Sequence, residues 1–159
     1  MKLRPSLTPS FWLRSASVLT LLLALGHAIG FPRTPDQGAE SMAVVARMQS
    51  VHFEVIGVQR SYWDFYVGFG HTISVCLLLL ATLFWLLPAA VPDPGRARTV
   101  VGVMLAAFVA IVGLDWVYFF AAPLVLAVAI ALCLAFALGS IRAPAGRTPL
   151  RETAPSVGP

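Results

Sequence analysis

Four long stretches of mainly apolar residues, separated by shorter polar segments, dominate the pattern of this chain. A helix rises about 1.5 Å per residue, so about 20 such residues are needed to cross roughly 30 Å of hydrocarbon. We therefore predict four membrane-spanning helices, at about residues 11–30, 64–87, 99–119 and 123–141. The expected fold class is all-α, with one domain: a four-transmembrane-helix bundle over residues 11–141.

The connection between the first and second spans is the longest. From Ala39 onward, apolar residues recur in it at helical spacing: Met42, Val45, Met48, Val51 and Val55. Charged and polar residues occupy the rest of the helical wheel. We therefore expect an amphipathic helix that lies on the outer membrane surface.

The remaining segments are short or rich in turn-forming residues. Residues 88–98 contain three prolines and a glycine, which predicts a tight turn between the second and third spans. The tail at 142–159 consists largely of proline, glycine, threonine and arginine and has almost nothing to bury. We expect it to be a disordered tail on the same side of the membrane as residues 1–10.

Composition supports a membrane protein and excludes a soluble globular domain. Of the 159 residues, 58% are hydrophobic and 11% are charged, whereas a soluble domain has about 45 to 50% apolar and about 25% charged residues. The mean hydropathy is +0.84. One domain of this length cannot bury so much apolar surface internally, so that surface must face lipid.

The basic residues predict the orientation in the membrane. The net charge is +4, but the basic residues are spread singly, so no nucleic-acid partner is expected. Eight of them flank one side of the predicted spans and three flank the other, which predicts a plasma-membrane protein with both termini in the cytoplasm. The eight are Lys2, Arg4, Arg14, Arg96, Arg98, Arg142, Arg147 and Arg151, and the three are Arg33, Arg47 and Arg60.

The first span has an alternative interpretation. Lys2 and Arg4 precede an apolar run that ends in small residues near Gly26, so residues 1–26 could be a cleaved signal peptide. The apolar pattern continues beyond Gly26 to Ile29. That continuation favours an uncleaved helix, and the signal peptide remains the alternative.

Ionisable residues inside membrane spans are costly and are therefore candidate functional residues. His27, His71 and Asp115 all fall within about 10 Å of the outer ends of their predicted helices. His27 shares its helical face with small residues, which predicts that it points into the bundle. We expect His27 and His71 to approach one another and to line a cavity with Gly68 and Thr20.

A polar stripe on the second predicted span extends this candidate site. Arg60, Asp64, Gly68 and His71 recur at spacings of three or four, and Arg60 and Asp64 are placed for an ion pair along the helix. The full set of candidate ligand-binding residues is His27, Arg60, Asp64, Tyr66, Gly68, His71 and Asp115. A stripe of this kind can also serve only to fix the register between helices.

The sequence gives no support for a metal site or a cofactor. Cys76 and Cys133 lie within predicted spans and lack the CxxC spacing of redox and zinc motifs. Axial haem or metal ligation by His27 and His71 is a less favoured possibility, because no second pair of histidines supports it. The catalytic residues, if any, are not identified.

The segment from Gln59 to His71, together with Gly26 and His27, carries a resemblance. It is similar to a group of small bacterial four-helix membrane proteins of uncharacterised function. More distantly, the arrangement resembles DoxX-like proteins and the four-helix emopamil-binding and sigma-2 proteins, which hold lipophilic ligands between helices. That resemblance implies a lipophilic ligand, but the functional positions of those families cannot be matched to this chain.

Two main hypotheses of function follow. The first is a pocket for a lipophilic small molecule that opens toward the outer leaflet. The second is an accessory or structural membrane subunit, in which the polar residues only fix helix register. Either protein has the lipid bilayer as a partner and is compatible with a homo- or hetero-oligomer.

A reporter enzyme fused after Pro159 tests the predicted orientation. Because the basic residues predict cytoplasmic termini, we expect activity only from a reporter that folds in the cytoplasm. The matched control is the same reporter inserted after Gln37, where only an export-dependent reporter should be active. An export-dependent reporter that is active after Pro159 would contradict the predicted topology.

Overall fold

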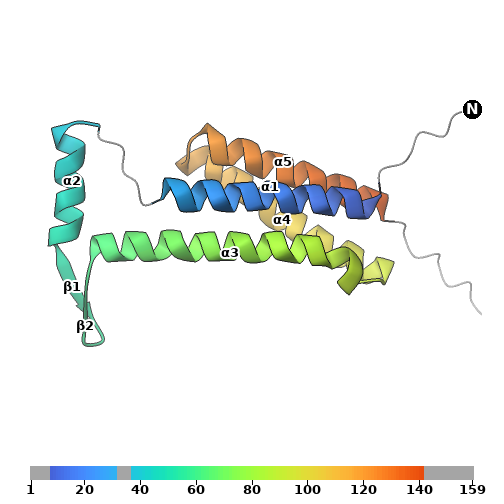
Figure 1. The fold of residues 1–159 in the computed structure, drawn as a ribbon, viewed down its shortest axis with the longest axis horizontal. Helices are drawn as coiled ribbons and strands as arrows, with labels where there is room; N and C mark the ends of the chain where they lie inside the picture. Colours follow the sequence, from blue (N-terminus) through green and yellow to red (C-terminus); the bar gives the residue numbers. More distant parts are fainter. Residues whose placement is uncertain (1–7, 32–36, 142–159) are drawn as a thin grey trace, which may run out of the picture.

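The computed structural model describes residues 8–31 and 37–141. In this part of the chain the elements follow the order shown in Figure 1. They are α1 (Pro9–Gly30), α2 (Ala39–Ser50), β1 (His52–Val55), β2 (Val58–Ser61), α3 (Tyr62–Ala90), α4 (Pro94–Tyr118) and α5 (Ala121–Ser140). Helices α1, α3, α4 and α5 are each long and apolar enough to cross a membrane, which confirms the prediction of four spans.

The four long helices form a bundle with α2 and the β1–β2 hairpin across one end (Figure 1). Helix α1 packs against α3 and α5, and α4 packs against α5. Because the number of spans is even, α1 begins and α5 ends at the same end of the bundle, opposite the hairpin. The end of the bundle that carries α2 and the hairpin is called the hairpin end below. The end where α1 begins and α5 ends is called the opposite end.

The core of the bundle is narrow, and most apolar side chains of the spans point outward. Buried residues from all four long helices meet along the axis, and the rings of Phe84 and Phe108 join α3 to α4 with centroids 5.8 Å apart. Large apolar side chains such as Val103 and Val125 remain more than 60% exposed. A protein in water does not leave so many such side chains uncovered, and lipid covers them here.

Two polar links reinforce the helix pairs. The buried Ser17 hydroxyl of α1 donates a hydrogen bond of 2.6 Å to the Ala81 carbonyl of α3. At the opposite end, the Arg98 guanidinium of α4 donates to the Leu138 and Ile141 carbonyls at 3.2 and 2.7 Å. The second link supplies donors to carbonyl groups at the end of α5 that have no partner within the helix.

Side-chain caps explain where several helices begin. Thr8 accepts a hydrogen bond from the Phe11 N–H at the start of α1, and Asp93 accepts one from the Arg96 N–H at the start of α4. Proline follows directly after each of these caps. Proline suits this position because the first backbone N–H groups of a helix have no partner inside it.

The connection between α3 and α4 is shorter than predicted. Pro88 belongs to the last turn of α3 rather than to the turn, and α4 already begins at Pro94. Only residues 91–93 remain between the two helices. A proline inside a helix removes one backbone hydrogen bond and bends the helix, and here only Ala89 and Ala90 follow it in α3.

The predicted amphipathic helix is correct in its first part and wrong in its second. Helix α2 ends at Ser50 rather than near Val55, and the following residues form the antiparallel hairpin β1–β2. Ile56 and Gly57 make its turn with φ of 52° and 75°, as a type I′ turn requires. The left-handed conformation at the β-branched Ile56 costs about 1 to 2 kcal/mol.

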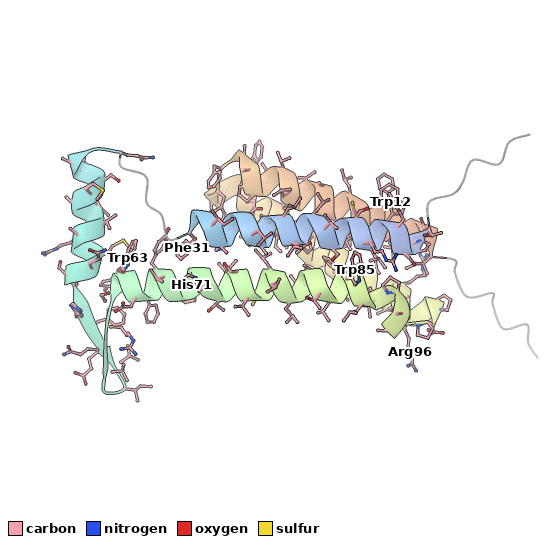
Figure 2. The ribbon with its side chains drawn as sticks, viewed as in Figure 1. Trp12, Phe31, Trp63, His71, Trp85 and Arg96 are labelled. Atoms are coloured by element: carbon pink, nitrogen blue, oxygen red, sulfur yellow. The ribbon has the colours of Figure 1, made fainter. Side chains whose placement is uncertain are left out.

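Tryptophans mark the two boundaries of the bundle. Trp63 lies at the hairpin end, and Trp12 and Trp85 lie at the opposite end (Figure 2). Trp63 and Trp85 on α3 are about 33 Å apart along the helix axis at the usual rise, close to the thickness of the hydrocarbon layer. This spacing is typical of aromatic belts at the two membrane interfaces.

Helix α2 lies across the hairpin end of the bundle (Figure 1). It runs across the direction of the long helices (Figure 1), and none of its residues is buried. Val45 and Met48 are half-buried on its more covered side. This arrangement suits an amphipathic helix parallel to the membrane plane.

Helix α3 depends on a capping box at its start. The Ser61 hydroxyl accepts from the Asp64 N–H at 3.1 Å, and the Asp64 carboxylate accepts from the Ser61 N–H at 2.8 Å. Replacing Ser61 with alanine removes a buried cap, and we expect it to lower the free energy of unfolding by about 1 kcal/mol. Thermal unfolding in detergent, followed by circular dichroism, measures this loss.

Ser50→Ala is the matched control for this variant. The Ser50 hydroxyl donates only to the Arg47 carbonyl on the exposed side of α2. Its removal should change the free energy of unfolding by less than about 0.5 kcal/mol. Equal unfolding temperatures for the two variants would show that the capping box does not hold the start of α3.

Candidate functional site

A cluster of aromatic and polar side chains joins α1 to α3 near the hairpin end. The end of α1 contributes His27 and the residue that follows the helix, Phe31. The first turns of α3 contribute the other members. We call this group the Phe31 cluster; its residues are His27, Phe31, Tyr66, Gly70, His71 and Ser74.

The ring of Phe31 occupies the centre of the cluster. It stacks on the His27 imidazole with centroids 5.5 Å apart and planes within 8°, and it lies 4.7 Å from the Tyr66 ring. His71 meets it edge to face at 5.9 Å. Figure 2 labels Phe31 and His71 at this end of the bundle.

Gly70 makes room for this ring. A Cβ atom at Gly70 would overlap the Cε1, Cζ and Cδ1 atoms of Phe31. The Phe31 ring therefore lies directly on the backbone of α3, which only glycine permits at this position. Gly68, one of the predicted site residues, has no such neighbour, because a Cβ there would meet nothing within 4 Å.

A hydrogen-bond chain links His27 to α3. The Ser74 hydroxyl lies 3.2 Å from the Gly70 carbonyl and 2.9 Å from His27 Nδ1. Ser74 therefore occupies Nδ1 of the imidazole, and its hydroxyl can donate to either neighbour. The other ring nitrogen, His27 Nε2, is the one that a ligand could reach.

The predicted approach of the two histidines is present. Their ring centroids are separated by no more than the sum of their distances to Phe31, 5.5 and 5.9 Å. This is well below the two helix diameters, about 20 Å, beyond which they could not share a site. The space between them is filled by Phe31 rather than being an open cavity. Thr20, expected on the wall, is fully buried and donates to the Ala16 carbonyl.

The predicted ion pair between Arg60 and Asp64 is wrong. It assumed that both residues lie on one helix, but Arg60 is on β2 and α3 begins at Tyr62. The Arg60 guanidinium donates to the Gln59 carbonyl at 2.8 Å. Asp64 instead completes the capping box with Ser61, so its carboxylate has a structural partner.

Asp115 lies on a different part of the bundle. Its side chain is buried near the end of α4, a helix that packs against α5. The contacts of the Phe31 cluster come from α1 and α3. Of the predicted site residues, the structure therefore brings together His27, Tyr66 and His71, and it does not join Arg60, Asp64, Gly68 or Asp115 to them.

The arrangement suits binding of a planar apolar group with one polar substituent. Two imidazoles and a phenol surround a slot that holds one six-membered ring, and His27 Nε2 is a ring nitrogen that Ser74 does not contact. Across residues 8–31 and 37–141, no group of three or more histidine, cysteine or acidic side chains is placed to hold a metal ion. Two cavities lined by described residues are elsewhere, one beside the first half of α1 and one at the opposite end of the bundle.

Replacing Gly70 with alanine tests the close packing in the cluster. The added methyl group overlaps the Phe31 ring, so we expect a loss of about 1 to 3 kcal/mol in the free energy of unfolding. Gly68→Ala is the matched control, because its methyl group meets no neighbour and removes glycine from a helix. That variant should be neutral or more stable by about 0.5 to 1 kcal/mol.

The double variant Phe31→Ala with Gly70→Ala completes this test. Without the Phe31 ring the methyl group has room, so the penalty of Gly70→Ala measured in the Phe31→Ala background should largely disappear. Chemical or thermal unfolding in detergent gives the four free energies of the cycle. Additive effects of the two substitutions would show that Phe31 does not lie on Gly70.

Comparison with known proteins adds no further identification. No protein-family profile, no curated protein and no solved structure matches this chain. The conclusions about its function therefore depend on the geometry above. That geometry identifies a small membrane protein with four spans.

Proposed function

We propose that this protein binds a lipophilic small molecule at the Phe31 cluster, between the hairpin ends of α1 and α3. The observation that carries the proposal is the ring slot over Gly70, in which the Phe31 ring is stacked on His27 and is also in contact with Tyr66 and His71. In the proposed bound state, a planar ring of the ligand takes the place of Phe31. The side chain of Phe31 then acts as a plug that leaves when the ligand enters.

The chemistry of the slot limits the ligand. Its walls are aromatic and its floor is the backbone at Gly70, which favours a flat apolar ring over a branched chain. His27 Nε2 is the ring nitrogen that Ser74 does not contact, so the ligand should carry a hydroxyl group beside the ring, which can donate to this nitrogen or accept from it. Phenol-like lipids satisfy both conditions.

The slot is accessible from lipid. Among the described residues, His71, Tyr66 and the neighbouring Phe69 are all exposed on the surface of α3. A ligand dissolved in the membrane can therefore reach the cluster without entering water. With cytoplasmic termini in the plasma membrane, as the basic residues predict, the site belongs to the outer leaflet.

The remaining predicted site residues have a smaller part in this proposal. Arg60 and Asp64 lie near the interface beside the cluster, and Gly68 and Asp115 lie outside it. The proposed contacts are therefore His27, Tyr66 and His71. No cofactor, metal or catalytic step is included.

One observation favours the alternative of a structural subunit. The hydrogen-bond chain from His27 through Ser74 to Gly70 fixes the register of α1 against α3. Polar links of this kind stabilise membrane helix pairs without any ligand. The experiment must therefore separate a binding slot from a helix clamp.

The probe for this experiment is an alkyl phenol that carries a photoreactive diazirine in its chain. Membrane vesicles that contain the full-length protein are mixed with the probe and irradiated, and the labelled peptides are identified by mass spectrometry. We expect labelling at the end of α1 and the first turns of α3. Loss of one hydrogen bond in His27→Ala should lower the labelling by about threefold to tenfold.

Two further variants distinguish the hypotheses. Phe31→Ala vacates the slot and should increase labelling, whereas a helix clamp predicts a less stable protein with no gain in labelling. His52→Ala is the matched control, because His52 is exposed on the hairpin and should leave labelling unchanged. Equal labelling of the wild type, His27→Ala and Phe31→Ala would contradict the proposed binding site.

A further inference from the structure

The β1–β2 hairpin has one apolar face and one polar face. In its register Phe53 pairs with Arg60 and Val55 pairs with Val58, and paired side chains share a face. The other face carries His52, Glu54, Gln59 and Ser61. We call the first the apolar hairpin face; it consists of Phe53, Val55, Val58 and Arg60, with Ile56 at the tip.

The apolar hairpin face continues onto the lipid-facing surface of α3. The Phe53 ring lies 5.0 Å from Tyr62 and 5.2 Å from Phe65, and Phe65 lies 5.6 Å from Phe69. Phe65 and Phe69 are 47% and 64% exposed on a helix that crosses the membrane. The hairpin therefore turns its apolar face toward the same lipid that surrounds α3.

The height of the hairpin matches the membrane interface. Its last residue, Ser61, is two positions before Trp63, the tryptophan at this boundary of the bundle. Figure 1 shows that the hairpin projects sideways from the start of α3, away from α1. Its tip thus overhangs lipid rather than another helix.

We propose that the β1–β2 hairpin lies flat on the phospholipid surface beside α3, with Val55, Ile56 and Val58 inserted among the headgroups and Arg60 bound to a lipid phosphate. Ile56 is 97% exposed, and Val55 and Val58 are 50% and 46% exposed. Full exposure of an isoleucine side chain to water is unfavourable, and contact with lipid gives it a less polar environment.

Arg60 favours phospholipid over a second copy of the chain or another protein. It is the one charged residue on the apolar hairpin face, and no carboxylate in the described residues lies within ion-pair distance of it. An arginine at the margin of an apolar surface, with its charged end at headgroup level, suits a phosphate group. The opposite face, with Glu54 and His52, then faces water.

Nitroxide accessibility in vesicles tests this proposal. The full-length protein without its two cysteines, Cys76→Ala and Cys133→Ala, is reconstituted in vesicles of phosphatidylcholine and phosphatidylglycerol. A nitroxide is attached through Ile56→Cys or, as the matched control on the polar face, through Glu54→Cys. Collisions with oxygen report lipid, and collisions with a water-soluble nickel complex report water.

We expect the ratio of oxygen to nickel accessibility to be higher at position 56 than at position 54, because apolar oxygen concentrates in lipid and the nickel complex stays in water. Adding Arg60→Glu should lower the ratio at position 56 toward the ratio at position 54. Adding Arg60→Lys should preserve the difference between the two ratios. These results would support the hairpin as a lipid-bound element.

Three outcomes would overturn the proposal. Equal, high nickel accessibility at positions 54 and 56 would show that both faces of the hairpin are in water. Low accessibility of position 56 to both oxygen and nickel would show that protein, either a second copy or a different partner, covers the tip. An unchanged ratio of oxygen to nickel accessibility at position 56 in the Arg60→Glu variant would exclude the contact between Arg60 and a lipid phosphate.

Discussion

Lipid offers no hydrogen-bond partner to a peptide group, and this constraint governs the whole structure. Each span must satisfy its backbone internally, so the four long segments are helices from one interface to the other. Polar side chains then act at the helix ends and in the few contacts between helices, or donate to a carbonyl of their own helix, as Thr20 and Thr82 do. The caps at Thr8, Ser61 and Asp93, and the Arg98 contact with the end of α5, all act at helix ends.

Within the membrane, the pair α1 and α3 is held at two depths by hydrogen bonds from serine. Ser17 reaches the Ala81 carbonyl in the middle of the bundle, and Ser74 links His27 to Gly70 nearer the hairpin end. Apolar contact alone gives little preference among helix pairings in lipid, so such links select one register. The close approach of Phe31 to Gly70 depends on that register.

The sequence predicted the features that depend only on distances counted in residues along the chain. Span lengths follow from about 20 apolar residues, and the shared depth of His27 and His71 follows from their distance to the helix ends. The position of Phe31 depends on how α1 approaches α3, which no local pattern records. Ser61 and Asp64, three residues apart, did carry a capping signal, and it indicates the start of α3 better than the apolar pattern does.

The hairpin was missed for a different reason. Met48, Val51 and Val55 fit a helical period, while the alternation of a four-residue strand is too short to outweigh it. Its turn is Ile56-Gly57, which lacks the asparagine or aspartate that normally identifies a type I′ hairpin. The pairing of β1 with β2, rather than the intrinsic preference of isoleucine, holds Ile56 in this turn.

The long helices differ in length, with consequences for the surrounding bilayer. Helix α3 has 29 residues and α5 has 20, which correspond to about 43 and 30 Å. Helix α5 therefore just matches an average hydrocarbon layer, whereas α3 has several turns to spare. A thicker, sterol-rich bilayer would have to thin next to α5 but not next to α3. This mismatch favours residence in membranes of ordinary or low thickness and makes the lipid shell around the protein uneven.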